Sequence, residues 1–148
     1  MMLKNSFLCW CFFLFSSVLF GQNISMEETL SYINGKLSGK YDIEVKRGLL
    51  LLTSYKDNMK MMEETTLITD LKPEVIYSEE EKAIIIKCSD GDKCIERKEY
   101  LVEKKNYFSR LKIVTPEDEK SVKGIQKAFL HLLRLVNEPK YKSSESFE

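Results

Sequence analysis

The sequence is poor in the residues from which most enzyme sites are built. Its 148 residues include one histidine, His131, and six glycines. It contains no Gly-x-Ser-x-Gly, no His-Glu-x-x-His and no phosphate-binding glycine loop, which argues against the hydrolases, zinc proteases and nucleotide-binding enzymes that carry them. A zinc site would need more ligands than one histidine supplies. The sequence therefore favours a non-enzymatic protein, with no catalytic residue, cofactor or metal to assign.

An excess of charge of either sign is also lacking. The 23 Lys and Arg residues balance 23 Asp and Glu residues, so the formal net charge is zero. A neutral chain has no overall field that attracts nucleic acid. We therefore expect no nucleic-acid partner, and electrostatic recognition has to come from a local patch.

Long apolar runs are absent except at the N-terminus. Residues 7–20 are apolar apart from two serines and follow Lys4. Fourteen residues are too few to cross roughly 30 Å of hydrocarbon as a helix, whereas a positive start followed by such a run is typical of a secretory signal peptide. We expect residues 1–21 to be removed and the protein to be exported, periplasmic or secreted. The Phe-rich run, with Gln22 as the new terminus, resembles exported proteins of Gram-negative bacteria.

Removal of this segment changes the composition. Cys9, Cys11 and Lys4 are lost, which leaves 127 residues, two cysteines and 22 basic against 23 acidic residues, a net charge of −1. That length suits one domain. We predict a single domain over residues 22–139, with no transmembrane segment, and a disordered tail over residues 140–148, which are polar and rich in serine.

Helix signals occur at both ends of the predicted domain. Ser25 and Glu28 form a capping box, and Leu30, Ile33 and Leu37 follow at helical spacing. Near the other end, Thr115 is placed to cap a helix with Pro116 at its first position. An apolar stripe follows and comprises Val122, Ile125, Phe129, Leu132, Leu133 and Val136.

Between the helices the apolar pattern has the period of strands. The pattern predicts about seven short strands, within residues 41–45, 49–55, 59–71, 75–77, 83–88, 95–100 and 107–114. Their connections are too short for crossover helices, so the sheet should be antiparallel. The expected fold class is α+β.

This order of elements, about seven antiparallel strands closed by an amphipathic helix, resembles the pleckstrin-homology-like barrel over residues 41–136. The resemblance implies a bent sheet with the C-terminal helix plugging one open end, and the N-terminal helix would be an addition. The alternative is an α+β roll, in which the sheet curls around the N-terminal helix. Families with this barrel bind lipids, peptides or proteins, so the resemblance implies no particular ligand.

The two remaining cysteines flank a small acidic turn, KCSDGDKC, at residues 87–94. A calcium loop is disfavoured because the segment is shorter than an EF-hand loop and lacks its distal glutamate. Their spacing does not match the Cys-x-x-Cys of redox proteins. In an exported chain such a pair most simply forms a disulfide, so Cys88 and Cys94 are predicted to be bonded at the tip of a hairpin.

That hairpin creates a conflict in strand register. If Cys88 faces Cys94, then Ile86 faces Glu96, and apolar residues oppose charged ones. Two resolutions remain open: a bulge near Gly91 or Lys93, or an edge strand over residues 96–99 whose charges discourage pairing with other chains.

The last sequence feature is a cluster of cations on the C-terminal helix. At 100° per residue they centre opposite the apolar stripe; they are Lys120, Lys123, Lys127, His131 and Arg134. This basic face is a candidate docking surface for an anionic partner, and an ordinary solvated face is the alternative.

Together these observations favour an exported, non-enzymatic binding domain of the cell envelope. The partner would be an envelope protein or an anionic surface. The alternatives are a structural accessory of an envelope assembly and, with less support, a lipid carrier or an enzyme with an interior cavity.

Overall fold

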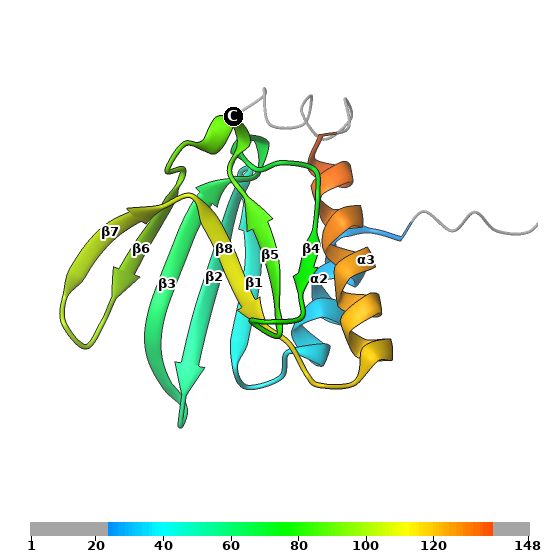
Figure 1. Ribbon diagram of the computed structural model, residues 1–148, viewed down its shortest axis with the longest axis horizontal. Helices are drawn as coiled ribbons and strands as arrows, with labels where there is room; N and C mark the ends of the chain where they lie inside the picture. The colour runs from blue at the N-terminus through cyan, green and yellow to red at the C-terminus, as the bar shows by residue number, and fades with distance from the viewer. Residues whose placement is uncertain (1–23, 138–148) are drawn as a thin grey trace, which may run out of the picture.

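The computed structural model describes residues 24–137 and contains, within them, two α-helices and eight antiparallel strands (Figure 1). The helices are α2 (Met26–Lys36) and α3 (Glu119–Val136), and short 3₁₀ turns occur at η1 (Ile68–Asp70) and η2 (Ser89–Gly91). The strands are β1 (Tyr41–Lys46), β2 (Leu49–Lys56), β3 (Met59–Leu67), β4 (Ile76–Ser78), β5 (Ala83–Lys87), β6 (Ile95–Glu99), β7 (Lys104–Phe108) and β8 (Arg110–Val114). The predicted α+β class with antiparallel strands is confirmed.

The strands form two separate sheets. One sheet has the order β1-β2-β3-β6-β7, and the other has the order β4-β5-β8. A barrel needs an unbroken ring of hydrogen-bonded strands, and neither sheet closes or curls in that way. The predicted pleckstrin-homology-like barrel is therefore wrong. For the alternative, a roll around the N-terminal helix, the relevant contacts are those of α2, which packs against α3 and β1 (Figure 1).

The chain changes sheet within a segment that was predicted to be a single strand, residues 107–114. β7 ends at Phe108 and β8 begins at Arg110, in different sheets. Between them, the carbonyl of Ser109 accepts a hydrogen bond from the Cys88 N–H at 2.9 Å. The bend is thus held by a contact that lies far away in sequence.

The predicted hairpin around the cysteines is also wrong. β5 pairs with β4 and β8, whereas β6 pairs with β3 and β7. Ile86 faces Leu111 and Glu96 faces Tyr107, so the apolar-to-charged mismatch does not arise. The bulge that was invoked to resolve the mismatch is unnecessary, because no hairpin joins the two strands. The edge-strand alternative is wrong too, since β6 lies inside its sheet and β7 forms the edge.

One row of side chains crosses the inner face of the five-stranded sheet. Directly opposed residues of neighbouring strands share a face, and the row runs Ile43, Leu52, Glu64, Arg97 and Asn106. It begins apolar and ends polar. Its first part lies over the hydrophobic core, while the β6–β7 hairpin extends away from the rest of the molecule (Figure 1).

The two helices close one side of the core. Every residue of the predicted α3 stripe is buried, and Phe129 and Leu132 are fully inaccessible. The predicted start of α3 is wrong by a few residues, because Asp118 is the N-cap and accepts from the Ser121 N–H at 2.8 Å. Thr115 is buried, and its N–H and hydroxyl donate to the Lys82 carbonyl. It therefore anchors the connection to the three-stranded sheet instead of capping the helix.

The capping box at the start of α2 is confirmed. The Glu28 N–H donates to the Ser25 hydroxyl at 3.1 Å, and the Glu28 carboxylate accepts from the Ser25 N–H at 2.8 Å. Near the other end of α2, the Asn34 side chain bonds both backbone groups of Ile43. The amide thereby satisfies part of the outer edge of β1.

The predicted signal peptide at residues 1–21, with Cys9 and Cys11, and the tail at 140–148 lie outside the described residues. Within residues 24–137, no helix combines the length and the apolar character needed to cross a membrane.

Candidate functional site

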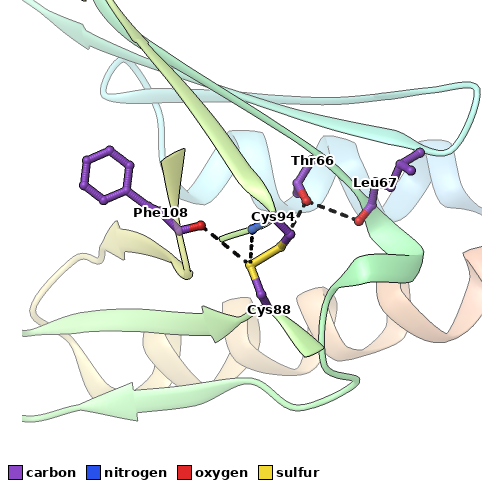
Figure 2. Close-up of a disulfide and its surroundings, with 5 residues drawn as sticks. All are labelled: Thr66, Leu67, Cys88, Cys94 and Phe108. Atoms are coloured by element: carbon purple, nitrogen blue, oxygen red, sulfur yellow. Dashed lines mark hydrogen bonds between the residues drawn. A yellow bond between two sulfur atoms is a disulfide. The ribbon is translucent and has the colours of Figure 1, made fainter. Parts of the chain in front are cut away.

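The predicted disulfide is present, but it joins the two sheets instead of stapling a hairpin. The sulfur atoms of Cys88 and Cys94 are 2.04 Å apart, and the Cα atoms are 5.8 Å apart. Cys88 follows β5 in one sheet, and Cys94 precedes β6 in the other. Figure 2 shows the bond beside the Thr66 side chain and the Phe108 carbonyl group, and Cys88 is only 1% exposed. The cystine, with Cys88 buried and Cys94 half-buried, serves to hold the sheets together.

The acidic turn beside the disulfide gives no sign of a cation site. Asp90 and Gly91 adopt positive φ angles of 56° and 71°, which lets the chain turn sharply between the sheets. Within the described residues, no three His, Cys, Asp or Glu side chains are grouped so that they could hold a metal ion.

A buried ion pair lies on the inner face of the five-stranded sheet. Glu64 is 1% exposed, and its Oε1 accepts from Nε and Nη2 of Arg97 at 2.8 and 2.6 Å. The guanidinium also lies 3.8 Å from the centroid of the Phe108 ring, which is a favourable cation–π arrangement. The other carboxylate oxygen, Oε2, has no partner among the described residues. Burial raises the pKa of Glu64, and the Arg97 contacts oppose that shift only in part.

The basic face predicted on α3 is only partly available to a partner. Lys120, Lys127 and Arg134 are exposed, whereas Lys123 pairs with Glu119 one turn earlier at 2.6 Å. That pair raises the pKa of Lys123 through the hydrogen bond and lowers the pKa of Glu119. Both members are exposed, so the pair is expected to break easily in favour of another anion.

His131, the fifth predicted member of this face, is half-buried and contacts the segment before α2. Its Nε2 lies 2.9 Å from the Ile24 carbonyl oxygen. Because a carbonyl can only accept, Nε2 carries the hydrogen in this contact. His131 thus ties the start of α2 to the later part of α3.

An apolar groove lies along the seam between the two helices, next to the basic face. It encloses about 430 Å³, and its lining residues are Ile24, Thr29, Tyr32, Gly124, Lys127, Ala128 and His131. A second hollow of about 490 Å³ adjoins it and shares Tyr32, Gly124 and Lys127, while Glu119, Lys120 and Lys123 complete its lining. Apolar and cationic surfaces therefore meet along one edge.

Tyr32 and Gly124 shape the boundary between these two hollows. A Cβ atom added at Gly124 would lie 2.1 Å from the Tyr32 hydroxyl oxygen, so the tyrosine occupies space that only glycine leaves open. Lys36 lies over the Tyr32 ring, with Nζ 5.7 Å from the centroid. Tyr32 is thus positioned by both helices while remaining 42% exposed.

Sequence reasoning found the cations of this site and missed its apolar part. The helical pattern placed Lys120 and Lys127 on one face of α3, but it gave no reason to bring Thr29 or Tyr32 beside them. One signal was present: Gly124 sits inside a strongly amphipathic helix, where glycine costs about 1 kcal/mol relative to alanine. A glycine in that position indicates a close packing contact.

Comparisons of the chain with protein-family models, with curated protein sequences and with solved structures find no match. The site is therefore interpreted from its own geometry.

Proposed function

We propose that the protein is an exported, non-enzymatic binding domain of the cell envelope that recognises an anionic partner through the α3 side of the molecule. The observation that carries this proposal is the meeting of the exposed cations of α3 with open hollows at the α2–α3 seam. Lys127 lines both hollows, so a ligand bound in either contacts the basic face. Export is supported by the N-terminal segment and by the cystine, since disulfides persist in oxidising compartments.

A second candidate function is that of a structural accessory in an envelope assembly. It is favoured by the exposed tip of the β6–β7 hairpin, where Leu101 and Val102 are 70% and 63% exposed. The tip lies across the molecule from the helices (Figure 1). A partner bound there would not require the cations of α3, so the two functions can be separated by mutation.

The test is a pull-down from the envelope fraction with four proteins. These are the wild type, Lys120→Glu/Lys127→Glu, the matched reversal Lys72→Glu/Lys87→Glu on exposed lysines elsewhere, and an unrelated domain. We expect the same species to be enriched by the wild type and by the matched reversal, and to be lost with the α3 reversal. The enrichment should weaken as salt is raised, because exposed charges are screened.

Two results would count against the proposed function. One is the absence of any species enriched above the unrelated domain. The other is unchanged enrichment by the α3 reversal, which would move the binding surface away from α3; loss of enrichment on Leu101→Ser/Val102→Ser would then favour the assembly role.

A further inference from the structure

The groove at the α2–α3 seam has the size and the lining of a small-molecule site. Its volume of about 430 Å³ falls within the roughly 300–1,000 Å³ of ligand pockets, which are mostly apolar with a few placed polar groups. Ile24, Tyr32 and Ala128 supply apolar walls, and Gly124 leaves backbone in place of a side chain.

Two polar side chains that line the groove, Thr29 and His131, are already engaged in hydrogen bonds. The Thr29 hydroxyl donates to the Ser25 carbonyl at 2.8 Å. Nε2 of His131 is bonded to the Ile24 carbonyl. Groups that are committed in this way offer little to a polar ligand, whereas the methyl of Thr29 and the ring of Tyr32 offer apolar contact. The part of a ligand that enters the groove should therefore be hydrocarbon.

The rim of the groove has the opposite character. Lys127 lies at the boundary with the second hollow, which Lys120 and Lys123 also line. Glu119 is the only acid among the residues lining that second hollow, and it is paired with Lys123. Within the described part of the chain, Lys120 and Lys127 make no ion pair or side-chain hydrogen bond. A negative group at the rim would meet two cations without an ionic partner.

We infer that the groove binds a single-chain anionic amphiphile, with its alkyl chain along the α2–α3 seam and its headgroup between Lys120 and Lys127. The chemical class is an alkyl carboxylate, sulfate or phosphate. This inference rests on the proposed function and specifies its ligand, because it adds an apolar requirement to the anionic one.

The test uses three probes with the same twelve-carbon chain and different headgroups: laurate, dodecyl maltoside and dodecyltrimethylammonium. The protein, as recovered from the expressing cells, is titrated with each probe below its critical micelle concentration, and binding is followed by calorimetry and native mass spectrometry. Laurate should bind at one to one. The uncharged and cationic probes should bind at least about tenfold more weakly, the effect expected from losing two exposed charge contacts.

Two variants separate the contributions of the chain and the headgroup. Ile24→Ser removes an apolar wall while keeping the backbone carbonyl that His131 contacts, and it should weaken laurate about tenfold. Lys127→Glu should weaken laurate by at least as much and should improve dodecyltrimethylammonium. The matched controls are Val102→Ser on the hairpin tip and Lys72→Glu, and both should bind laurate like the wild type.

The source of the ligand is tested with butyrate and with vesicles of phosphatidylglycerol. If vesicles bind but monomeric laurate does not, the basic face docks on a bilayer surface and the groove inference is overturned, while the proposed function stands. If butyrate binds as tightly as laurate, the headgroup alone is recognised, and the inference fails in the same way. If all three twelve-carbon probes bind equally and Lys127→Glu has no effect, the groove is a neutral apolar site and the inference fails; the anionic function fails with it only if the pull-down is also unchanged by Lys120→Glu/Lys127→Glu.

Discussion

The two halves of the inner face of the five-stranded sheet are built in different ways. Under β1 and β2 the face is aliphatic, with Ile43 and Leu52 buried against the core. Under β3 and β6 the same row continues as Glu64 and Arg97. The boundary runs between Leu52 and Glu64, which are directly opposed. Burial of hydrocarbon is favourable in itself, whereas burial of a carboxylate is tolerated only because a cation and hydrogen bonds accompany it.

The two halves of this sheet are stabilised by different kinds of interaction. The aliphatic half is held by packing with the other sheet and the helices. The polar half reaches beyond most of that core and is held by specific bonds, namely the ion pair, the stacking of Arg97 on Phe108 and the disulfide. Mutations in the two halves should therefore differ in how their effects depend on partners, pH and redox state.

The largest effect is expected in the aliphatic half. Leu52 is buried in the core, so Leu52→Ala should leave a cavity there and lower the free energy of unfolding by about 3 kcal/mol. Urea denaturation measures the change. Leu49→Ala, in the same strand but at its exposed end, should lose much less. A loss below about 1 kcal/mol for Leu52→Ala would show that this half is not the main source of stability.

The next effect concerns the ion pair. Arg97→Ala leaves Glu64 buried without its cation, and we expect a loss of about 2 kcal/mol, less than for a fully buried pair because Arg97 remains 20% exposed. Adding Glu64→Gln to Arg97→Ala should recover much of the loss, because burial of an unpaired neutral amide costs less free energy than burial of an unpaired charge. Lys98→Ala, at the next and exposed position, is the control. If the double variant is no more stable than Arg97→Ala, the uncompensated charge is not the cause.

The disulfide should contribute a similar or slightly smaller amount. Cys88→Ala/Cys94→Ala should lower the free energy of unfolding by about 2 kcal/mol, because the bond closes only a short loop. Reduction of the wild type should add the mass of two hydrogen atoms and produce the same loss. An unchanged mass after reduction would mean that the bond does not form in the isolated protein. A loss near zero would mean that packing alone joins the sheets.

The smallest effect is a dependence on pH. Burial raises the pKa of Glu64 in the folded state, so the folded protein binds this proton more tightly than the unfolded chain, where the pKa is about 4.3. The stabilising contribution of protonated Glu64 is fully present below the unfolded pKa and is lost as pH rises through the folded pKa. The stability of Glu64→Gln relative to the wild type should therefore increase with pH above about 4. Comparison with this variant isolates Glu64 from acids whose pKa is lowered, such as Glu81 and Glu96. The opposite slope would show that Arg97 outweighs burial.

Sequence patterns predicted local elements well and their assembly poorly. The capping box at Ser25 and the buried stripe on α3 depend on residues within a few positions of each other, so local spacing is sufficient to identify them. The pairing of β5 and β6 was wrong because adjacency in sequence was taken as adjacency in the sheet. The five residues between Cys88 and Cys94 instead carry the chain from one sheet to the other.

The candidate site likewise has one part that local sequence spacing predicts and one part that depends on tertiary contacts. The cations Lys120 and Lys127 follow from the helical period, because they and the apolar stripe lie on one helix. The groove beside them depends on α2, which is separated from α3 by all eight strands, and no pattern within either helix predicts that Tyr32 packs over Gly124. The Glu64–Arg97 pair was missed for a similar reason: the two residues lie far apart in sequence and are brought together only by the pairing of β3 with β6.

The sequence by itself determined where most of the helices and strands lie, which face of α3 is apolar and which is basic, and that two cysteines are positioned to bond. These properties arise from interactions between residues close together along the chain. The tertiary structure decided that KCSDGDKC connects two sheets, that Glu64 is buried against Arg97, and that an apolar groove adjoins the basic face. These depend on contacts between segments far apart in sequence, where burial and strand pairing outweigh local preference.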